Sequence, residues 1–178
     1  RAAAVAITRL WAEEGDRART LGTELHSLIE HRLNEEALHR AVPPTLRKEW
    51  AQFEAFLDSS FVRDRNLTPF RTEVPVFHES EIGTRVAGTI DAIFVDNRGE
   101  HYMLDFKRVK SDKKIYPHDC GFNNRLGIGV AADLPDTEFS RYSLQLSAYA
   151  LLLESCTGID VGRNTFMLVM HDDRDEYA

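Results

Sequence analysis

The sequence predicts an α/β protein in which helices flank a mixed central sheet. Three observations lead to this fold class. Residues 1–66 carry apolar side chains at helical spacing, the middle of the chain contains three successive segments rich in β-branched residues, and a further helical pattern precedes a last apolar segment. The order of helices, a three-stranded meander, a helix and a strand is typical of an α/β sandwich.

Three helices are expected before the sheet. Residues 2–14 form the first and residues 21–34 the second, because their apolar side chains recur at helical spacing. Thr45, after a proline pair, could cap a third helix that ends near residue 61. Leu67-Thr-Pro is expected to be a turn. The stripe of the second helix consists of Leu21, Leu25, Leu28, Ile29 and Leu33.

The rest of the chain supplies the sheet and one more helix. Asp96-Asn-Arg-Gly99 has the composition of a hairpin turn, so the strands on either side of it are expected to be antiparallel neighbours. Long loops without regular structure are usually functional or mobile. The expected elements are strands at 71–78, 85–95 and 101–109, a long loop at 111–138, a helix at 139–155 and a strand at 164–171.

Size and composition fit one soluble domain spanning residues 1–178. Hydrophobic residues make up 43% and charged residues 29%, which is ordinary for a globular protein. The chain contains no apolar run of about 18 residues, so no membrane span is expected. The formal net charge of −7 counts modestly against a purely electrostatic nucleic-acid binder.

Cysteine usage and the chain ends carry two further expectations. Cys120 and Cys156 cannot build a disulfide framework or a four-cysteine metal site, which fits a reducing, intracellular location. The sequence starts within a helical pattern and stops shortly after an expected strand. We therefore expect this domain to belong to a longer polypeptide with further domains.

Two acids and a lysine on neighbouring strands are the most informative feature. Side chains alternate between the two faces of a strand, so Asp105 and Lys107 share one face of their strand. On the preceding strand Asp91 points away from the face expected for Ile90, Ala92 and Phe94, and the hairpin brings it near Asp105. The apolar face of the later strand consists of Tyr102, Leu104 and Phe106.

Two carboxylates held close together repel each other unless a cation lies between them. Oxygen ligands favour Mg²⁺ or Mn²⁺, which can polarise a phosphate and activate a bound water. Lys107 could orient that water or stabilise the developing negative charge. The alternative is a surface ion pair between Asp105 and Lys107 with no catalytic role.

Four short motifs together resemble the PD-(D/E)XK nuclease superfamily, and specifically its RecB-like branch. Gly88-Thr-Ile-Asp91 and Asp105-Phe-Lys107 are similar to the nuclease core. Gly22-Thr-Glu-Leu-His26 is similar to the histidine motif of that branch, and Gln145-Leu-Ser-Ala-Tyr149 to its Gln-x-x-x-Tyr motif. They occur in the family's order, and the resemblance implies a restriction-endonuclease-like α/β/α sandwich that hydrolyses nucleic acids.

The resemblance also implies roles for individual residues. The metal ligands would be side chains and one backbone carbonyl, the lysine would be catalytic, and the late helix would contact the nucleic-acid strand. Ile90 stands where the family name has a proline, as is usual in the RecB-like branch, and two cysteines cannot hold the iron–sulfur cluster of some members. The implied ligands are His26, Asp91, Asp105 and the Phe106 carbonyl; Lys107 is catalytic; Gln145 and Tyr149 line the site.

For several other residues the sequence allows both a functional and a purely structural role. Without the motif, a helix histidine such as His26 is a hydrogen-bonded core residue. Glu73 is a possible extra metal ligand or an edge-strand charge, and Glu30 a possible support for the histidine or a solvated helix charge. A basic stretch after the catalytic strand could hold phosphates or be a solvated loop. It comprises Lys107, Arg108, Lys110, Lys113 and Lys114, and Tyr116 and Phe122 in the same loop could stack on bases or pack on the domain.

The sequence therefore favours a Mg²⁺- or Mn²⁺-dependent nuclease acting on DNA, single-stranded or with free ends, rather than on RNA. A cap-snatching-like RNA endonuclease is the second hypothesis, and the Gln-x-x-x-Tyr motif at Gln145 argues against it. The third is a non-catalytic nucleic-acid-binding or scaffold domain on the same fold. Neither the direction of cutting nor the choice between exonuclease and endonuclease follows from these residues.

Overall fold

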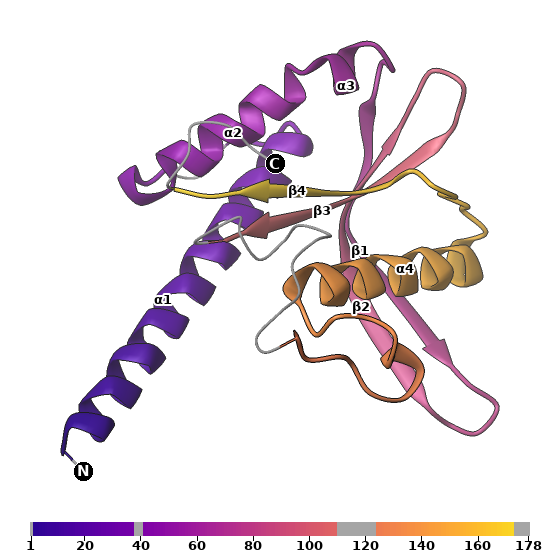
Figure 1. The fold of residues 1–178 in the computed structure, drawn as a ribbon. Coiled ribbons are helices and arrows are strands. Elements are labelled where there is room, and N and C mark those ends of the chain that lie inside the picture. Colours follow the sequence, from indigo (N-terminus) through magenta and orange to yellow (C-terminus); the bar gives the residue numbers. More distant parts are fainter. Residues whose placement is uncertain (1, 38–40, 110–123, 173–178) are drawn as a thin grey trace.

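A four-stranded mixed sheet with helices on both faces forms the body of the protein (Figure 1). The computed structural model describes residues 2–37, 41–109 and 124–172. Its strands are β1 (Thr68–Glu79), β2 (Arg85–Val95), β3 (His101–Arg108) and β4 (Thr165–Met170), arranged in that order across the sheet. The predicted α/β class with a mixed sheet is thereby confirmed.

Connection lengths explain the strand directions. β1, β2 and β3 are antiparallel neighbours joined by short turns, and Asp96 closes the second turn by accepting the backbone N–H groups of Arg98 and Glu100. β4 pairs parallel to β3, because the intervening helix α4 (Glu138–Thr157) carries the chain back to the same end of the sheet. Thr137 caps the start of α4 by accepting the N–H of Ser140 at 3.1 Å.

The two helices expected at the start of the chain are one continuous helix, α1 (Ala2–Leu33), and the prediction of a break was wrong. The segment between the two expected helices contains Gly15 but no proline, and one glycine costs a helix only about 1 kcal/mol. Ion pairs one turn apart lie on either side of Gly15, between Arg9 and Glu13 and between Arg19 and Asp16. In Figure 1 the N-terminal half of α1 extends well beyond the sheet.

The third expected helix is divided, and its expected cap was wrong. A 3₁₀ turn (Pro44–Leu46) leads into α2 (Arg47–Leu57), and a separate short helix α3 (Ser60–Arg63) follows. Thr45 lies inside the 3₁₀ turn. Neither the 3₁₀ turn nor α2 begins with a side-chain cap. The cap that does form is Ser59, which accepts the N–H of Val62 and starts α3.

The turn expected at residues 67–69 was also wrong, because Thr68 and Pro69 already belong to β1. A proline is tolerated there since β1 is an edge strand and its pairing with β2 is irregular between Pro69 and Arg71. The chain turns one residue earlier than the expected turn, at Asn66, which has a φ of 51°.

Each face of the sheet has its own apolar core. Leu25, Ile29 and Phe53 from α1 and α2 pack on one face, where they meet Tyr102, Leu104 and Phe106 of β3 as the strand alternation predicts. Leu152 and Leu153 of α4 pack on the other face with Met103. One predicted position was wrong: Ile90 belongs to the α4 side, whereas Ala92 and Phe94 belong to the α1 side. No helix among the described residues is long and apolar enough to cross a membrane.

Candidate metal centre

The sheet forks at the point where the acidic residues lie. Pairing between β2 and β3 ends at Ala92 and Leu104, whereas pairing between β1 and β2 continues to Arg85. At the fork the backbone of Glu73 has a φ of 46°, an unusual conformation for a residue with a side chain. By the register this residue lies opposite Asp91, and on either side of Asp91 the side chains of Ile90 and Ala92 face opposite cores.

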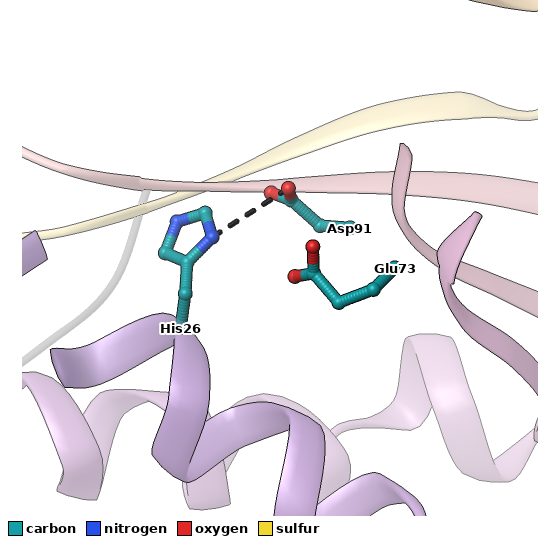
Figure 2. Close-up of side chains that lie close together, drawn as sticks. All are labelled: His26, Glu73 and Asp91. Carbon is teal, nitrogen blue, oxygen red and sulfur yellow. Dashed lines mark ion pairs between the residues drawn. The ribbon is translucent and has the colours of Figure 1, made fainter. Parts of the chain in front are cut away.

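Three side chains from three elements converge at this fork. His26 of α1, Glu73 of β1 and Asp91 of β2 each bring one potential ligand atom to within 4.8 Å of the others. Figure 2 shows the imidazole rising from the helix toward the strands, with both carboxylates directed at it. Among the residues that the structure describes, this is the one His, Cys, Asp or Glu group with metal-binding geometry.

The hydrogen bonds of His26 fix which ring nitrogen faces the acids. Nε2 lies 2.7 Å from the carbonyl oxygen of Phe106, which can only accept, so Nε2 carries the proton and donates. In the neutral ring Nδ1 then presents a lone pair, and it lies 3.5 Å from Oδ1 of Asp91 (Figure 2). Two lone-pair atoms this close repel each other, and a metal ion between them would turn that repulsion into attraction.

The backbone of Phe106 holds both groups in place. Its N–H donates to Oδ2 of Asp91 at 2.6 Å, at the step where the β2–β3 ladder has ended. Its carbonyl oxygen accepts from His26 as described above. The resemblance assigns this carbonyl to the metal, but in this structure it orients the imidazole. Two of the implied ligands, His26 and Asp91, are therefore both hydrogen-bonded to the backbone of one residue, Phe106.

The site concentrates negative charge. Burial raises the pKa of Glu73, the carboxylates of Asp91 and Glu30 raise it further, and His26 opposes them. Glu30 lies one helical turn after His26 and lines the same open pocket of about 370 Å³. The other residues lining the pocket are Gly22, Thr23, His26, Ser27 and Glu73. A divalent cation would relieve the repulsion among the carboxylates of Glu73, Asp91 and Glu30.

Asp105 and Lys107 form a separate pair beside the group. The Lys107 ammonium donates to Oδ1 of Asp105 at 2.8 Å and lies 2.7 Å from Oδ2, with which it makes no hydrogen bond. Asp105 is 4% exposed, and burial raises its pKa against the effect of Lys107, while Asp91 raises it further. The structure does not bring Asp105 into the three-residue group, although the two sites interact electrostatically.

The Gln-x-x-x-Tyr motif lies on α4, on the far side of the sheet from α1. The ring of Tyr149 rests on Gly88 of β2, where an added Cβ would lie 2.6 Å from the tyrosine hydroxyl oxygen. Gly88 is thus required by the close approach of the ring, three residues before Asp91. Gln145 is half-buried one turn earlier on the same helix.

Arg108 points away from Lys107, into the core between the sheet and α2. Its Nε donates to Glu49 at 2.7 Å and a terminal nitrogen lies 3.5 Å from Asp172. Its side chain is 8% exposed and that of Glu49 is 1% exposed, so the pair is buried. Lys110, Lys113, Lys114, Tyr116 and Phe122 lie outside the described residues.

Two residues, Glu73 and Tyr142, lie closer to the candidate site than the sequence predicts. Counting outward from the turn between β1 and β2 places Glu73 directly opposite Asp91, and this register was available from the sequence. The sequence motifs do not include Tyr142, yet its ring centroid lies 5.5 Å from the Lys107 ammonium. It precedes Tyr149 by seven residues, two helical turns, so the helical period could have identified it.

No protein-family model matches the chain, and no curated protein matches it significantly. The interpretation of the site therefore rests on its geometry and on the four motifs.

Proposed function

We propose that this protein is a metal-dependent nuclease of the RecB-like PD-(D/E)XK type, which hydrolyses phosphodiester bonds in DNA. The observation that carries the proposal is the convergence of His26, Glu73 and Asp91 beside the Asp105–Lys107 pair. A restriction-endonuclease-like fold belongs to the same proposal, supported by helices on both faces of a mixed sheet.

The donor set fits Mg²⁺ or Mn²⁺. Two carboxylates supply hard oxygen ligands, and the Nδ1 lone pair of His26 adds a nitrogen that Mn²⁺ accepts readily. Asp105 is close enough to influence Asp91 and could join the ligands, as the resemblance implies. When bound, such an ion polarises a phosphate and lowers the pKa of a water molecule.

The protein side chains have complementary tasks. The backbone N–H and carbonyl groups of Phe106 orient the Asp91 carboxylate and the His26 imidazole, and this orientation would suit a cation. Lys107 places a positive charge beside the acids, where it stabilises negative charge that develops on a phosphate. Gln145 and Tyr149, on the helix opposite α1, would contact the nucleic-acid strand.

Metal binding and cleavage test the proposal together. Isothermal titration with Mn²⁺ should show binding that Asp91→Asn and His26→Ala each abolish. Cleavage of labelled single-stranded DNA should require the metal and be lost in Asp91→Asn and Lys107→Ala. Glu81→Gln is the matched control, because it removes one negative charge from an exposed position of the same hairpin. It should bind Mn²⁺ and cut as the wild type does.

Three outcomes decide between the hypotheses. Loss of Mn²⁺ binding in Asp91→Asn and His26→Ala and of cleavage in Asp91→Asn and Lys107→Ala, with folding preserved in circular dichroism, supports the nuclease. Cleavage of capped RNA in preference to DNA would favour the cap-snatching-like enzyme. The nuclease proposal fails if Mn²⁺ binding does not depend on Asp91, and the scaffold hypothesis then takes its place. It also fails if Lys107→Ala cuts at the wild-type rate, because the cleavage would then not come from this site.

A further inference from the structure

The ammonium of Lys107 lies between two partners of different kinds. One is the Asp105 carboxylate, at 2.7 and 2.8 Å, and the other is the aromatic ring of Tyr142, whose centroid is 5.5 Å away. An ammonium within about 6 Å of a ring centroid is attracted by the negative face of the ring. The lysine is therefore held from β3 and from α4 at once.

Tyr142 is well placed for this role because its ring is itself held. It packs with Val109, Val169 and Met167 in a small apolar cluster at the end of β3 and β4. Its hydroxyl donates to Glu138, one turn earlier on α4, at 3.4 Å. The ring face toward Lys107 is thus set by packing, and the hydroxyl is directed at another residue.

The two partners respond differently to a cation at the neighbouring group. A divalent ion near Asp91 attracts the Asp105 carboxylate and repels the Lys107 ammonium, which weakens the ion pair. The ring of Tyr142 is uncharged, so its attraction for the ammonium does not depend on that competition. With a cation bound, the ring would therefore be the partner whose attraction for the ammonium is unchanged.

We propose that Tyr142 is a positioning residue that holds the Lys107 ammonium at the reaction centre when the metal site is filled. This inference rests on the proposed nuclease function for its kinetic consequence, but the lysine–ring contact can be tested without activity. The ring is the required group, and the hydroxyl is dispensable.

The kinetic test compares variants that keep or remove the ring. Tyr142→Leu should lower kcat by about 2- to 30-fold, the range expected for a lost cation–π contact, with little change in KM for DNA. Tyr142→Phe should retain the wild-type kcat. Val169→Ala is the matched control, because it removes packing from the same buried cluster without removing the ring. It should lower stability while kcat is preserved.

A spectroscopic test separates this inference from the proposed function. The side-chain amine signal of Lys107 in the ¹⁵N-labelled protein can be assigned by its absence in Lys107→Arg. Its ring-current shift should persist in Tyr142→Phe on addition of Mg²⁺ and disappear in Tyr142→Leu. The inference is overturned if wild type and Tyr142→Leu give the same signal with Mg²⁺, or if Tyr142→Phe loses as much kcat as Tyr142→Leu. If none of the proteins cleaves DNA, the nuclease proposal fails and the signal alone decides.

Discussion

At the scale of single residues, the candidate site is a cluster of groups whose charges conflict without a cation. His26 presents a lone pair toward Asp91, and Glu73 and Asp105 both have raised pKa values. Folding holds these side chains close together, although repulsion and burial oppose it. Such an arrangement is characteristic of a binding site whose stability is completed by its ligand.

This conflict predicts a pH dependence for the metal-free protein. Because the folded pKa values of Glu73 and Asp105 lie above the ordinary values of 4.5 and 3.8, the folded state binds these protons more tightly than the unfolded chain. Their contribution to the free energy of unfolding is complete at a pH below the ordinary pKa values. It is lost as the pH rises through the raised pKa values of the folded state. In thermal unfolding with EDTA, the stabilisation from these two groups should therefore decrease as the pH is raised from the acid range.

Glu73→Gln should remove part of that decline, because the amide carries no charge to repel Asp91. In thermal melts with EDTA the variant should unfold at a higher temperature than wild type at neutral pH, and Mn²⁺ should stabilise it less. Glu81→Gln on the same hairpin should leave both effects unchanged. If the unfolding temperature of Glu73→Gln depended on pH as that of the wild type does, Glu73 would not interact with the neighbouring carboxylates.

At the scale of secondary-structure elements, the contact of α4 with β2 depends on one glycine. Gly88 leaves room for the ring of Tyr149, so the helix approaches the strand closely at the position leading into Asp91. The opposite face of the sheet is covered by α1, which supplies His26. The site therefore depends on two helices that dock on opposite faces of the sheet.

Gly88→Ala should displace the Tyr149 ring and lower the free energy of unfolding by about 1–3 kcal/mol, the usual cost of overpacking. Tyr149→Ala removes the clash, so the double variant should be more stable than the sum of the single changes implies. Urea unfolding of the four proteins measures this coupling. Strict additivity would mean that the ring does not rest on Gly88.

At the scale of the whole molecule, buried polar contacts connect the C-terminal ends of β3 and β4 to α2. Arg108 of β3 is paired with Glu49, and the side chain of Gln52 makes two hydrogen bonds with the backbone of His171, directly after β4. These contacts join segments far apart in sequence. They fix the end of β3 that carries Lys107, so they bear on the site without belonging to it.

Arg108→Met should be strongly destabilising, by about 3–5 kcal/mol in urea unfolding, since it leaves the Glu49 carboxylate buried without its partner. The double variant Glu49→Gln, Arg108→Met should recover most of that loss. If Arg108 instead serves mainly to bind phosphates, as the basic stretch suggested, the single variant would stay stable and lose affinity for DNA in a salt-dependent manner.

The sequence by itself determined the four strands to within a few residues, the alternation that separates Asp105 and Lys107 from the apolar face of β3, and the helix with the Gln-x-x-x-Tyr motif. These features depend on periods of two and 3.6 residues, which are local properties of the chain. The turn residues after Val95 are also local, and β2 has the predicted bounds, Arg85–Val95.

The tertiary structure alone decided which side chains meet. His26 and Phe106 are 80 residues apart, and Arg108 and Glu49 are 59 apart, so no local pattern pairs them. The fold brings Glu73 of the edge strand β1 close to Asp91 and His26, while Asp105 stays with Lys107 outside the three-residue group. Local periodicity fixes the face on which a side chain lies, but its partner depends on how distant elements pack.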